Sequence, residues 1–168
     1  AYLSFQAQHI PLQAPQEFID KYLTRYEDGW EVLREDRKNR AIKKGIFPEN
    51  KNIVDSFSDF DSWSEIDQEN KKIFIKSMAV FAGMLDAMDF HIGRFINYLK
   101  DENLYDNTIF IITADNGPEG NDPSDHAPWR DWIKTTIYDR DYDTLGDQNS
   151  YVYIGTEFAQ ATASPSHL

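Results

Sequence analysis

The longest hydrophobic pattern of the chain lies between residues 62 and 100. Apolar side chains recur there three or four positions apart, which is the spacing of one face of an α-helix. Ser62 and Glu65 have the spacing of an N-terminal capping box. The pattern predicts one long helix from about Ser62 to about Lys100 that packs its apolar stripe against a sheet; the stripe consists of Phe74, Met78, Phe81, Leu85, Met88, Ile92, Phe95 and Leu99.

A different pattern follows this helix. Residues 108–114 are mostly β-branched or aromatic and show no polar alternation. Such a run is typical of a strand buried on both faces of a parallel sheet. It ends at the turn-forming triplet Asp115-Asn116-Gly117, in which a carboxylate and an amide are neighbours. Because ligands bind at the carboxyl ends of strands in open α/β sheets, we expect this turn at a functional edge.

His9 also follows a predicted strand. Residues 1–8 have the pattern of a strand end, and Pro11 cannot donate to a β-ladder, so the strand is expected to stop near His9. In one parallel sheet, His9 and Asp115 would lie at the same edge. A histidine that merely caps its strand is the structural alternative.

Shorter patterns predict the remaining elements. Two helices are expected, one opening at Pro15 and one at residues 28–44, where Asp28 and Glu31 have capping-box spacing. Helix, short loop and buried strand together indicate an α/β fold. We expect one partial domain over residues 1–168.

The segment 118–149 is predicted to be a long loop with a short helix that opens at Pro128. A loop of this length after a central strand is usually functional or disordered. Trp129 and Trp132 either anchor the loop to the core or line an aryl-binding rim. His91, His126 and His167 are expected to be structural or exposed.

Composition narrows the function classes. The chain has 168 residues, 40% of them hydrophobic, which suffices for a domain with a core. Its formal net charge of -12 argues against nucleic acid and anionic membranes as partners. The longest apolar run, Ala79–Leu85, is too short to span a bilayer. Neither end resembles a natural terminus, so we expect an internal fragment of a longer protein.

Asp115 and Asn116 are candidate metal ligands. Carboxylate and amide oxygens are hard ligands that suit Ca²⁺ or Mg²⁺ better than transition metals. Two ligands do not complete a site, because Ca²⁺ takes about six to eight oxygens. Further ligands must come from the long loop or from outside these residues.

The block from Leu104 to Glu119 resembles the second conserved block of the sulfatase family, within the alkaline-phosphatase-like superfamily. Residues 1–15, with Gln8-His9-Ile10-Pro11, resemble the family's strand and active-site histidine turn. Residues 21–37, 78–89 and 149–166 are similar to segments of bacterial arylsulfatases, in the same order. The resemblance implies an α/β fold: a fragment of an alkaline-phosphatase-like parallel-sheet sandwich, helix-rich with few strands.

The resemblance also implies roles for three residues. Asp115 and Asn116 match ligands of the family's single Ca²⁺ ion, and His9 matches a catalytic histidine that contacts the sulfate ester and helps to protonate the leaving alkoxide. The family's nucleophile is a formylglycine made from a Cys/Ser-x-Pro-x-Arg motif. This chain has no cysteine and no Ser-x-Pro-x-Arg, so the nucleophile lies outside it. We therefore expect an arylsulfatase fragment that is inactive alone.

Two alternatives stay open. A phosphodiester or phosphonate monoester hydrolase of the same superfamily would share the histidine and the metal turn. A binding or structural domain could keep the fold without the chemistry. The expected substrate is a small-molecule or glycan sulfate ester, and unpaired strand edges are expected to favour self-association. The resemblance implies export to the periplasm or secretion, with the cytoplasm as the alternative.

Overall fold

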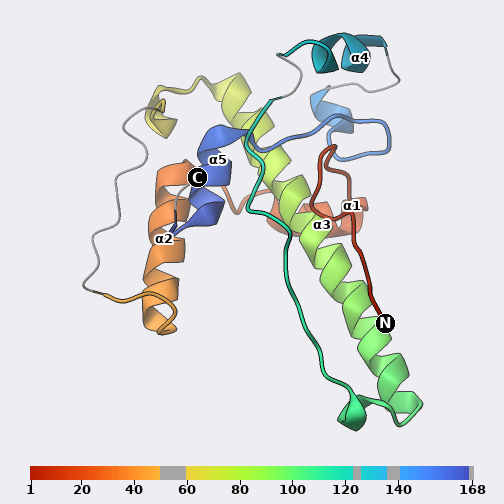
Figure 1. Cartoon of the computed structure of the whole chain (residues 1–168). Helices are drawn as coiled ribbons and strands as arrows, with labels where there is room; N and C mark the ends of the chain where they lie inside the picture. The colour runs from red at the N-terminus through yellow and green to blue at the C-terminus, as the bar shows by residue number, and fades with distance from the viewer. Residues whose placement is uncertain (50–59, 123–125, 136–140, 167–168) are drawn as a thin grey trace.

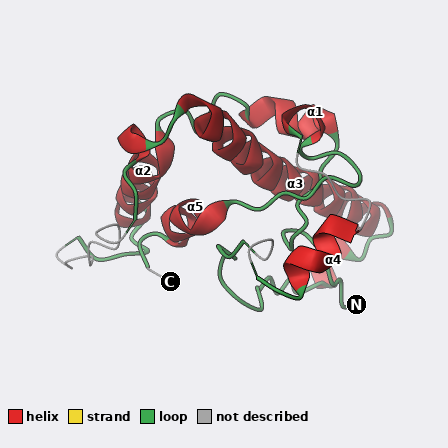
Figure 2. Cartoon of the chain, turned by 90° about the horizontal axis from the view of Figure 1, so that it is seen from above, coloured by secondary structure: helices red, strands yellow, loops and turns green. Residues whose placement is uncertain are grey.

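The computed structural model of the chain describes residues 1–49, 60–122, 126–135 and 141–166. Regular structure in these ranges is helical and no β-strand occurs in them (Figures 1 and 2). The fold is therefore helix-rich, as predicted, and the parallel-sheet sandwich stays a prediction. The helices are α1 (Gln16–Ile19), α2 (Gly29–Lys43), α3 (Gln68–Asp101), α4 (Trp129–Thr135) and α5 (Gly155–Ala163), with 3-10 turns η1 (Asp20–Tyr22), η2 (Trp63–Glu65), η3 (Tyr105–Asn107) and η5 (Tyr142–Thr144).

The long helix α3 confirms the main pattern of the sequence, but it begins at Gln68 rather than near Ser62. The capping box predicted at Ser62 and Glu65 exists, and it caps the short turn η2. Asp67 then starts α3, because its carboxylate accepts hydrogen bonds from the backbone N–H groups of Glu69 at 3.0 Å and Asn70 at 2.9 Å.

Helix α3 buries its apolar face mainly in its first half, and Leu99 near its end is buried as well. Residues 76–80 and Gly83 are buried, whereas Leu85, Phe90 and Tyr98 are exposed. The expectation that the whole stripe packs on a sheet is wrong for the described residues, because α3 packs instead on α1 and η1. The helices approach closely at Gly83, where an added Cβ would lie 2.9 Å from the backbone nitrogen of Ile19.

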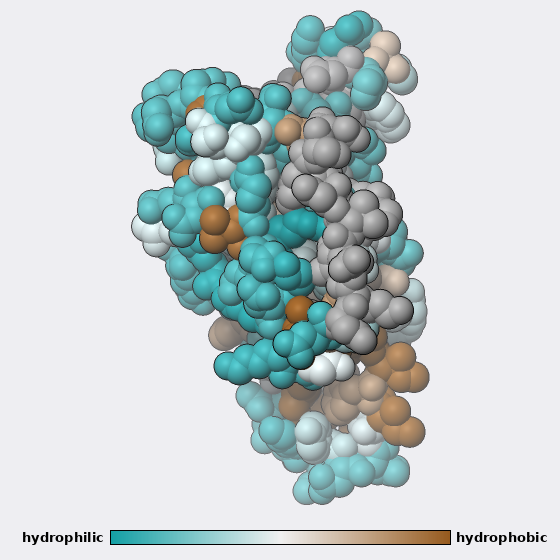
Figure 3. All heavy atoms as spheres, turned by 90° about the vertical axis from the view of Figure 1, so that its left-hand side faces the viewer, coloured by the Kyte–Doolittle hydropathy of each residue, from teal (hydrophilic) through white to brown (hydrophobic). Residues whose placement is uncertain are grey.

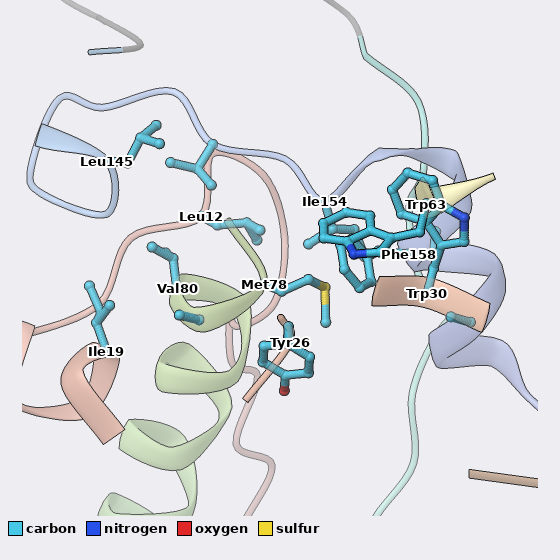
Figure 4. Packing of buried hydrophobic residues seen from close by; sticks show 14 residues of the cluster. Leu12, Ile19, Tyr26, Trp30, Trp63, Met78, Val80, Leu145, Ile154 and Phe158 are labelled. Atoms are coloured by element: carbon cyan, nitrogen blue, oxygen red, sulfur yellow. The ribbon is translucent and has the colours of Figure 1, made fainter. Parts of the chain in front are cut away.

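The core joins aromatic side chains from four elements. Trp30 of α2 lies edge-on to Trp63 of η2 at 4.7 Å between ring centroids, to Phe158 of α5 at 5.5 Å and to Phe74 of α3 at 5.6 Å. Figure 4 shows Met78 between this aromatic group and an aliphatic group that includes Val80. Edge-to-face packing of this kind adds to the free energy gained by burial.

Helix α2 is confirmed, but its predicted capping box is not formed. Asp28 makes no side-chain hydrogen bond to the helix N-terminus. Glu31 instead accepts a hydrogen bond from the backbone N–H of Trp63 at 2.9 Å. A long-range contact therefore takes the carboxylate that the local pattern assigned to the cap.

Long-range hydrogen bonds tie residues 12–14 and helix α5 to the rest of the core. The backbone N–H of Leu12 donates to the carbonyl of Val152 at 3.0 Å, and that of Ala14 donates to Gly146 at 3.0 Å. The buried Arg34 donates from Nη1 to the carbonyl of Gln160 at 3.3 Å, which ties α2 to α5. In the described ranges, no helix combines the length and the apolar character needed to cross a membrane.

Candidate active site

The apolar segment 108–114 is extended but is not a strand of a sheet. It leads from η3, at the foot of α3, back toward α4 (Figure 1). Ile109 is 90% exposed, Ile111 86% and Ile112 87%. The prediction of a strand buried on both faces is therefore wrong for this chain by itself. A strand needs a neighbour to take its backbone hydrogen bonds, and the described residues provide none.

Asp115 and Asn116 lie at the exposed end of this segment, where the sequence placed them. The backbone N–H of Asn116 donates to Oδ1 of Asp115 at 3.0 Å. The side-chain nitrogen of Asn116 donates to the carbonyl of Gly117 at 2.7 Å. Since the amide nitrogen is engaged, the amide oxygen is the atom of Asn116 suited to a cation, next to the Asp115 carboxylate.

His9 lies in an exposed turn, and its Nδ1 is 2.6 Å from the carbonyl oxygen of Ile10. A carbonyl oxygen only accepts, so Nδ1 is the nitrogen that carries the proton. In the neutral ring Nε2 is then unprotonated, and only the imidazolium has a proton to give from Nε2. The nearby Gln8 side chain donates to the carbonyl of Phe81 on α3 at 3.1 Å, which holds this turn against the helix.

The structure brings Asp115 and Asn116 together but shows no interaction between either of them and His9 among the described residues. The same part of the chain contains no group of three or more His, Cys, Asp or Glu residues able to hold a metal ion. The two oxygen ligands fit Ca²⁺ in type, and they supply only part of the six to eight oxygens that it takes.

The two tryptophans of α4 are both largely exposed. Trp129 is 57% exposed and Trp132 48%, and their rings meet edge-on at 6.3 Å. Ile133 is the buried residue of α4. His126 is exposed, as is His91, whose Nδ1 lies 3.1 Å from Nη1 of Arg94. His167 is outside the described residues.

The sequence pattern missed the role of Lys76. This lysine is buried, and its Nζ donates to the carbonyls of Tyr142 at 2.6 Å and Asp143 at 3.2 Å. Nζ also lies 4.7 Å from the Tyr142 ring centroid. Lys76 thus fixes η5, near the end of the long loop. Its position in the sequence could have indicated this burial, because Lys76 lies on the same helical face as Ile73 and Val80.

Comparison with known proteins shows the family. Residues 1–153 match the sequence model of the family described as Sulfatase. The chain is 38% identical to an uncharacterized sulfatase of Schizosaccharomyces pombe, with 100% of this chain and 30% of the relative aligned. It is 30% identical to an arylsulfatase of Klebsiella aerogenes over 98% of this chain and 35% of the relative. An arylsulfatase of Clostridium perfringens is 30% identical over 68% of this chain and 21% of the relative.

These matches identify the family, and the family is one of hydrolases. The chain belongs to the sulfatase family. It spans about a third or less of the length of these curated relatives. The family resemblance of the Asp115 turn and the His9 turn therefore rests on a chain-wide match rather than on isolated motifs.

Proposed function

We propose that this chain is part of a sulfuric-ester hydrolase of the arylsulfatase type. The observation that carries the proposal is the Asp115-Asn116-Gly117 turn at the end of an apolar extended segment, in a chain of the sulfatase family. The matching relatives include two named arylsulfatases. The substrate would be a small-molecule or glycan sulfate ester.

In this proposal, Asp115 and Asn116 would be two of the ligands of one Ca²⁺ ion, with a carboxylate and an amide oxygen as donors. When bound, the ion supplies positive charge that neutralises the oxygens of a sulfate ester. This also accounts for an anionic substrate on a chain with a net charge of -12, because a bound cation reverses the local field. The remaining ligands would come from a longer protein that contains this chain, in segments that correspond to the unaligned parts of the relatives.

His9 would act on the leaving group. Because Nδ1 donates to the Ile10 carbonyl at 2.6 Å, Nε2 is the ring nitrogen that would be left to contact a substrate. The imidazolium form can donate the Nε2 proton to a leaving alkoxide, which is general acid catalysis. The nucleophile, a formylglycine, lies outside this chain, which contains no cysteine.

The test uses a sulfatase-length protein that contains this chain. Its turnover of an aryl sulfate is compared with that of a bis-aryl phosphate. We expect Asp115→Ala to abolish aryl sulfate turnover and His9→Ala mainly to lower kcat. Asp106→Ala and His91→Ala are the matched controls, since both residues are exposed and lie outside the proposed site.

The outcomes separate the alternatives. Preference for the phosphate diester would favour the phosphodiesterase or phosphonate hydrolase. Absence of both activities, together with absence of a Cys/Ser-x-Pro-x-Arg motif from the complete protein, would favour a non-catalytic domain. Full activity in Asp115→Ala would remove the metal role from this residue.

A further inference from the structure

We propose that Lys76 is a positioning residue for His9, on which it acts through the segment 142–152. This role rests on the proposed function, in which His9 protonates the leaving group, because only then does the place of His9 affect turnover. All the contacts involved join described residues of this chain, and the residues at their centre are buried.

Lys76 is a buried cation held by backbone carbonyls. Lysines ordinarily lie at the surface, and hydrophilic residues cover most of the face of the molecule shown in Figure 3. Lys76 is only 8% exposed, and its Nζ donates to the carbonyls of Tyr142 at 2.6 Å and Asp143 at 3.2 Å. An ammonium group taken out of water needs partners that replace the water, so these two carbonyls are fixed against α3.

The segment that Lys76 binds continues into a tight turn against the same helix. Leu145 follows η5 and is buried, and Figure 4 shows it on the same side of the core as Val80. Gly146 comes next with a φ of 98°, and a Cβ there would lie 2.7 Å from Cγ2 of Val80. The N–H of Gly146 donates to Oγ of the buried Ser150 at 2.9 Å, which closes the turn. This packing leaves the turn little room to shift.

Residues 12–14, which follow the His9 turn, are joined to residues 146–152 by three hydrogen bonds. The donors and acceptors are the N–H of Leu12 and the carbonyl of Val152 at 3.0 Å, Nε2 of Gln13 and the carbonyl of Ser150 at 3.1 Å, and the N–H of Ala14 and the carbonyl of Gly146 at 3.0 Å. Leu12 and Val152 are each 1% exposed, so water does not compete for the bond between them. A shift of residues 142–152 would therefore carry residues 12–14 with it.

The His9 turn is thus tied to α3 on both sides. On its N-terminal side, Nε2 of Gln8 donates to the carbonyl of Phe81 at 3.1 Å. On its C-terminal side, the three bonds and the tight turn lead to Lys76. Both Lys76 and Phe81 belong to α3, so one helix is the base of both ties. A general acid must lie within hydrogen-bond reach of the atom that it protonates, so loss of one tie is expected to slow proton transfer.

Aryl sulfate turnover by a sulfatase-length protein that contains this chain is the first test. Lys76→Met keeps an unbranched side chain but cannot donate to the carbonyls of Tyr142 and Asp143. We expect kcat to fall roughly tenfold to a hundredfold with KM little changed, as a misplacement of about 1 Å can cause. Lys76→Arg keeps a donor and should restore most of the turnover. Lys72→Met is the matched control, because Lys72 lies one turn earlier, is exposed and pairs with Glu69.

A double-mutant cycle shows whether Lys76 acts through His9. Lys76→Met added to His9→Ala should leave kcat at the value of His9→Ala alone, because a residue that is absent cannot be misplaced. A role of Lys76 in general stability would instead lower turnover by the same factor with and without His9. Equal factors overturn the proposal, as does an unchanged kcat in Lys76→Met.

Histidine NMR of the 168-residue chain gives a readout that needs no turnover. The ring signals of His9, identified by their loss in His9→Ala, should shift in Lys76→Met and not in Lys72→Met. The signals of the exposed His91 are the internal reference. Far-UV circular dichroism checks that the variants keep their helices.

Gln13→Ala is the second variant, for the case that Lys76→Met does not fold. It breaks one of the three bonds, to Ser150, and should shift the same His9 signals. Gln16→Ala is its control, because Gln16 bonds only locally, to Asp20. His9 signals that stay unchanged in every folded variant overturn the proposal. Shifted His9 signals in a chain whose longer protein lacks aryl sulfate turnover would support the contact path and overturn the proposed function instead.

Discussion

At the scale of single residues, Phe158 is a fully buried member of the aromatic core. Its ring contacts Trp30 at 5.5 Å, Trp63 at 5.8 Å and Tyr26 at 6.2 Å between centroids. We expect Phe158→Ala to lower the free energy of unfolding by about 3 to 5 kcal/mol, because it removes buried surface and leaves a cavity. Urea unfolding measures this loss.

The matched control is Ile46→Ala, at a side chain that is 73% exposed. Its effect should stay within about 0.5 kcal/mol, as is usual for surface substitutions. Equal effects of the two substitutions would contradict the placement of the aromatic core. Because small domains have only about 5 to 15 kcal/mol of stability in total, Phe158→Ala is also expected to lower the yield of folded protein.

The carboxylate of Asp67 gives a pH-dependent prediction at the same scale. Hydrogen bonds from the backbone N–H and then the side chain of Asn70 lower the pKa of Asp67. A lowered folded-state pKa means that the stabilisation is fully present above the unfolded-state pKa of about 3.9 and is lost as the pH falls through the folded value. We expect Asp67→Ala to destabilise α3 near neutral pH and to approach the wild type in strong acid.

Urea unfolding across a pH series measures this difference. Asp61→Ala is the control, because Asp61 is exposed and lies before the helix cap. A difference between wild type and Asp67→Ala that does not shrink in acid would show that the cap does not depend on the ionised carboxylate.

Residue-level prediction from the sequence worked where contacts are local. The capping box at Ser62 and Glu65, which forms at η2, and the Asp115-Asn116 turn both depend on neighbours in the chain. It failed where a distant partner takes the side chain. Glu31 accepts a hydrogen bond from Trp63 instead of capping its own helix. Lys76, to which the sequence assigned no role, is buried and donates to carbonyls of η5.

At the scale of elements, Gly83 and Gly93 of α3 form a matched pair. A Cβ at Gly83 would lie 2.9 Å from the backbone nitrogen of Ile19 and 3.1 Å from its Cα, whereas a Cβ at Gly93 would meet no atom within 4 Å. We expect Gly83→Ala to destabilise the protein by about 1 to 3 kcal/mol, since helix α1 must move away. Gly93→Ala should stabilise it by about 0.5 to 1 kcal/mol through helix propensity.

Thermal unfolding of the two variants compares these effects in opposite directions. Because both are the same substitution in the same helix, general effects of alanine cancel. A Gly83→Ala variant as stable as the wild type would mean that α1 and α3 do not approach as closely as the structure shows.

Elements were predictable from the sequence when their own periodicity fixed them. Helices α2, α3 and α4 lie close to their predicted positions because 3.6-residue spacing and turn signals are local properties. The segment 108–114, predicted to be a buried strand, has no regular structure and is mostly exposed. Strand formation depends on neighbouring strands, which local pattern cannot supply. The same reason explains why Leu85 of the α3 stripe is exposed and why Met88, Ile92 and Phe95 are only half-buried.

At the scale of the whole molecule, the candidate site residues agree with membership of the sulfatase family. The described residues do not bring them together into one site. The sequence predicted Asp115, Asn116 and His9, and the structure places all three in exposed turns without an interaction of His9 with the other two among the described residues. Their convergence was expected from a shared sheet edge, and the described ranges contain no sheet. The roles of these residues therefore stay predictions.

Incomplete coordination leads to a prediction for the chain as it is. Ca²⁺ takes about six to eight oxygens, and the described residues assemble no cluster of three or more His, Cys, Asp or Glu around the Asp115 turn. A ligand stabilises a protein appreciably only when its concentration approaches or exceeds its dissociation constant. We expect millimolar Ca²⁺ to leave the melting temperature of the 168-residue chain unchanged and expect the purified chain not to hydrolyse an aryl sulfate.

Differential scanning fluorimetry with Ca²⁺ or with a chelator, and an aryl sulfate assay on the same samples, measure both outcomes. Asp115→Ala is the control: if Ca²⁺ raises the melting temperature of the wild type and not of this variant, the turn binds the ion without further acidic ligands. Turnover by the wild-type chain would show that it needs no nucleophile from outside. If neither occurs, a sulfatase-length protein that regains a Ca²⁺-dependent melting temperature through Asp115 would show that the missing ligands lie in the additional chain.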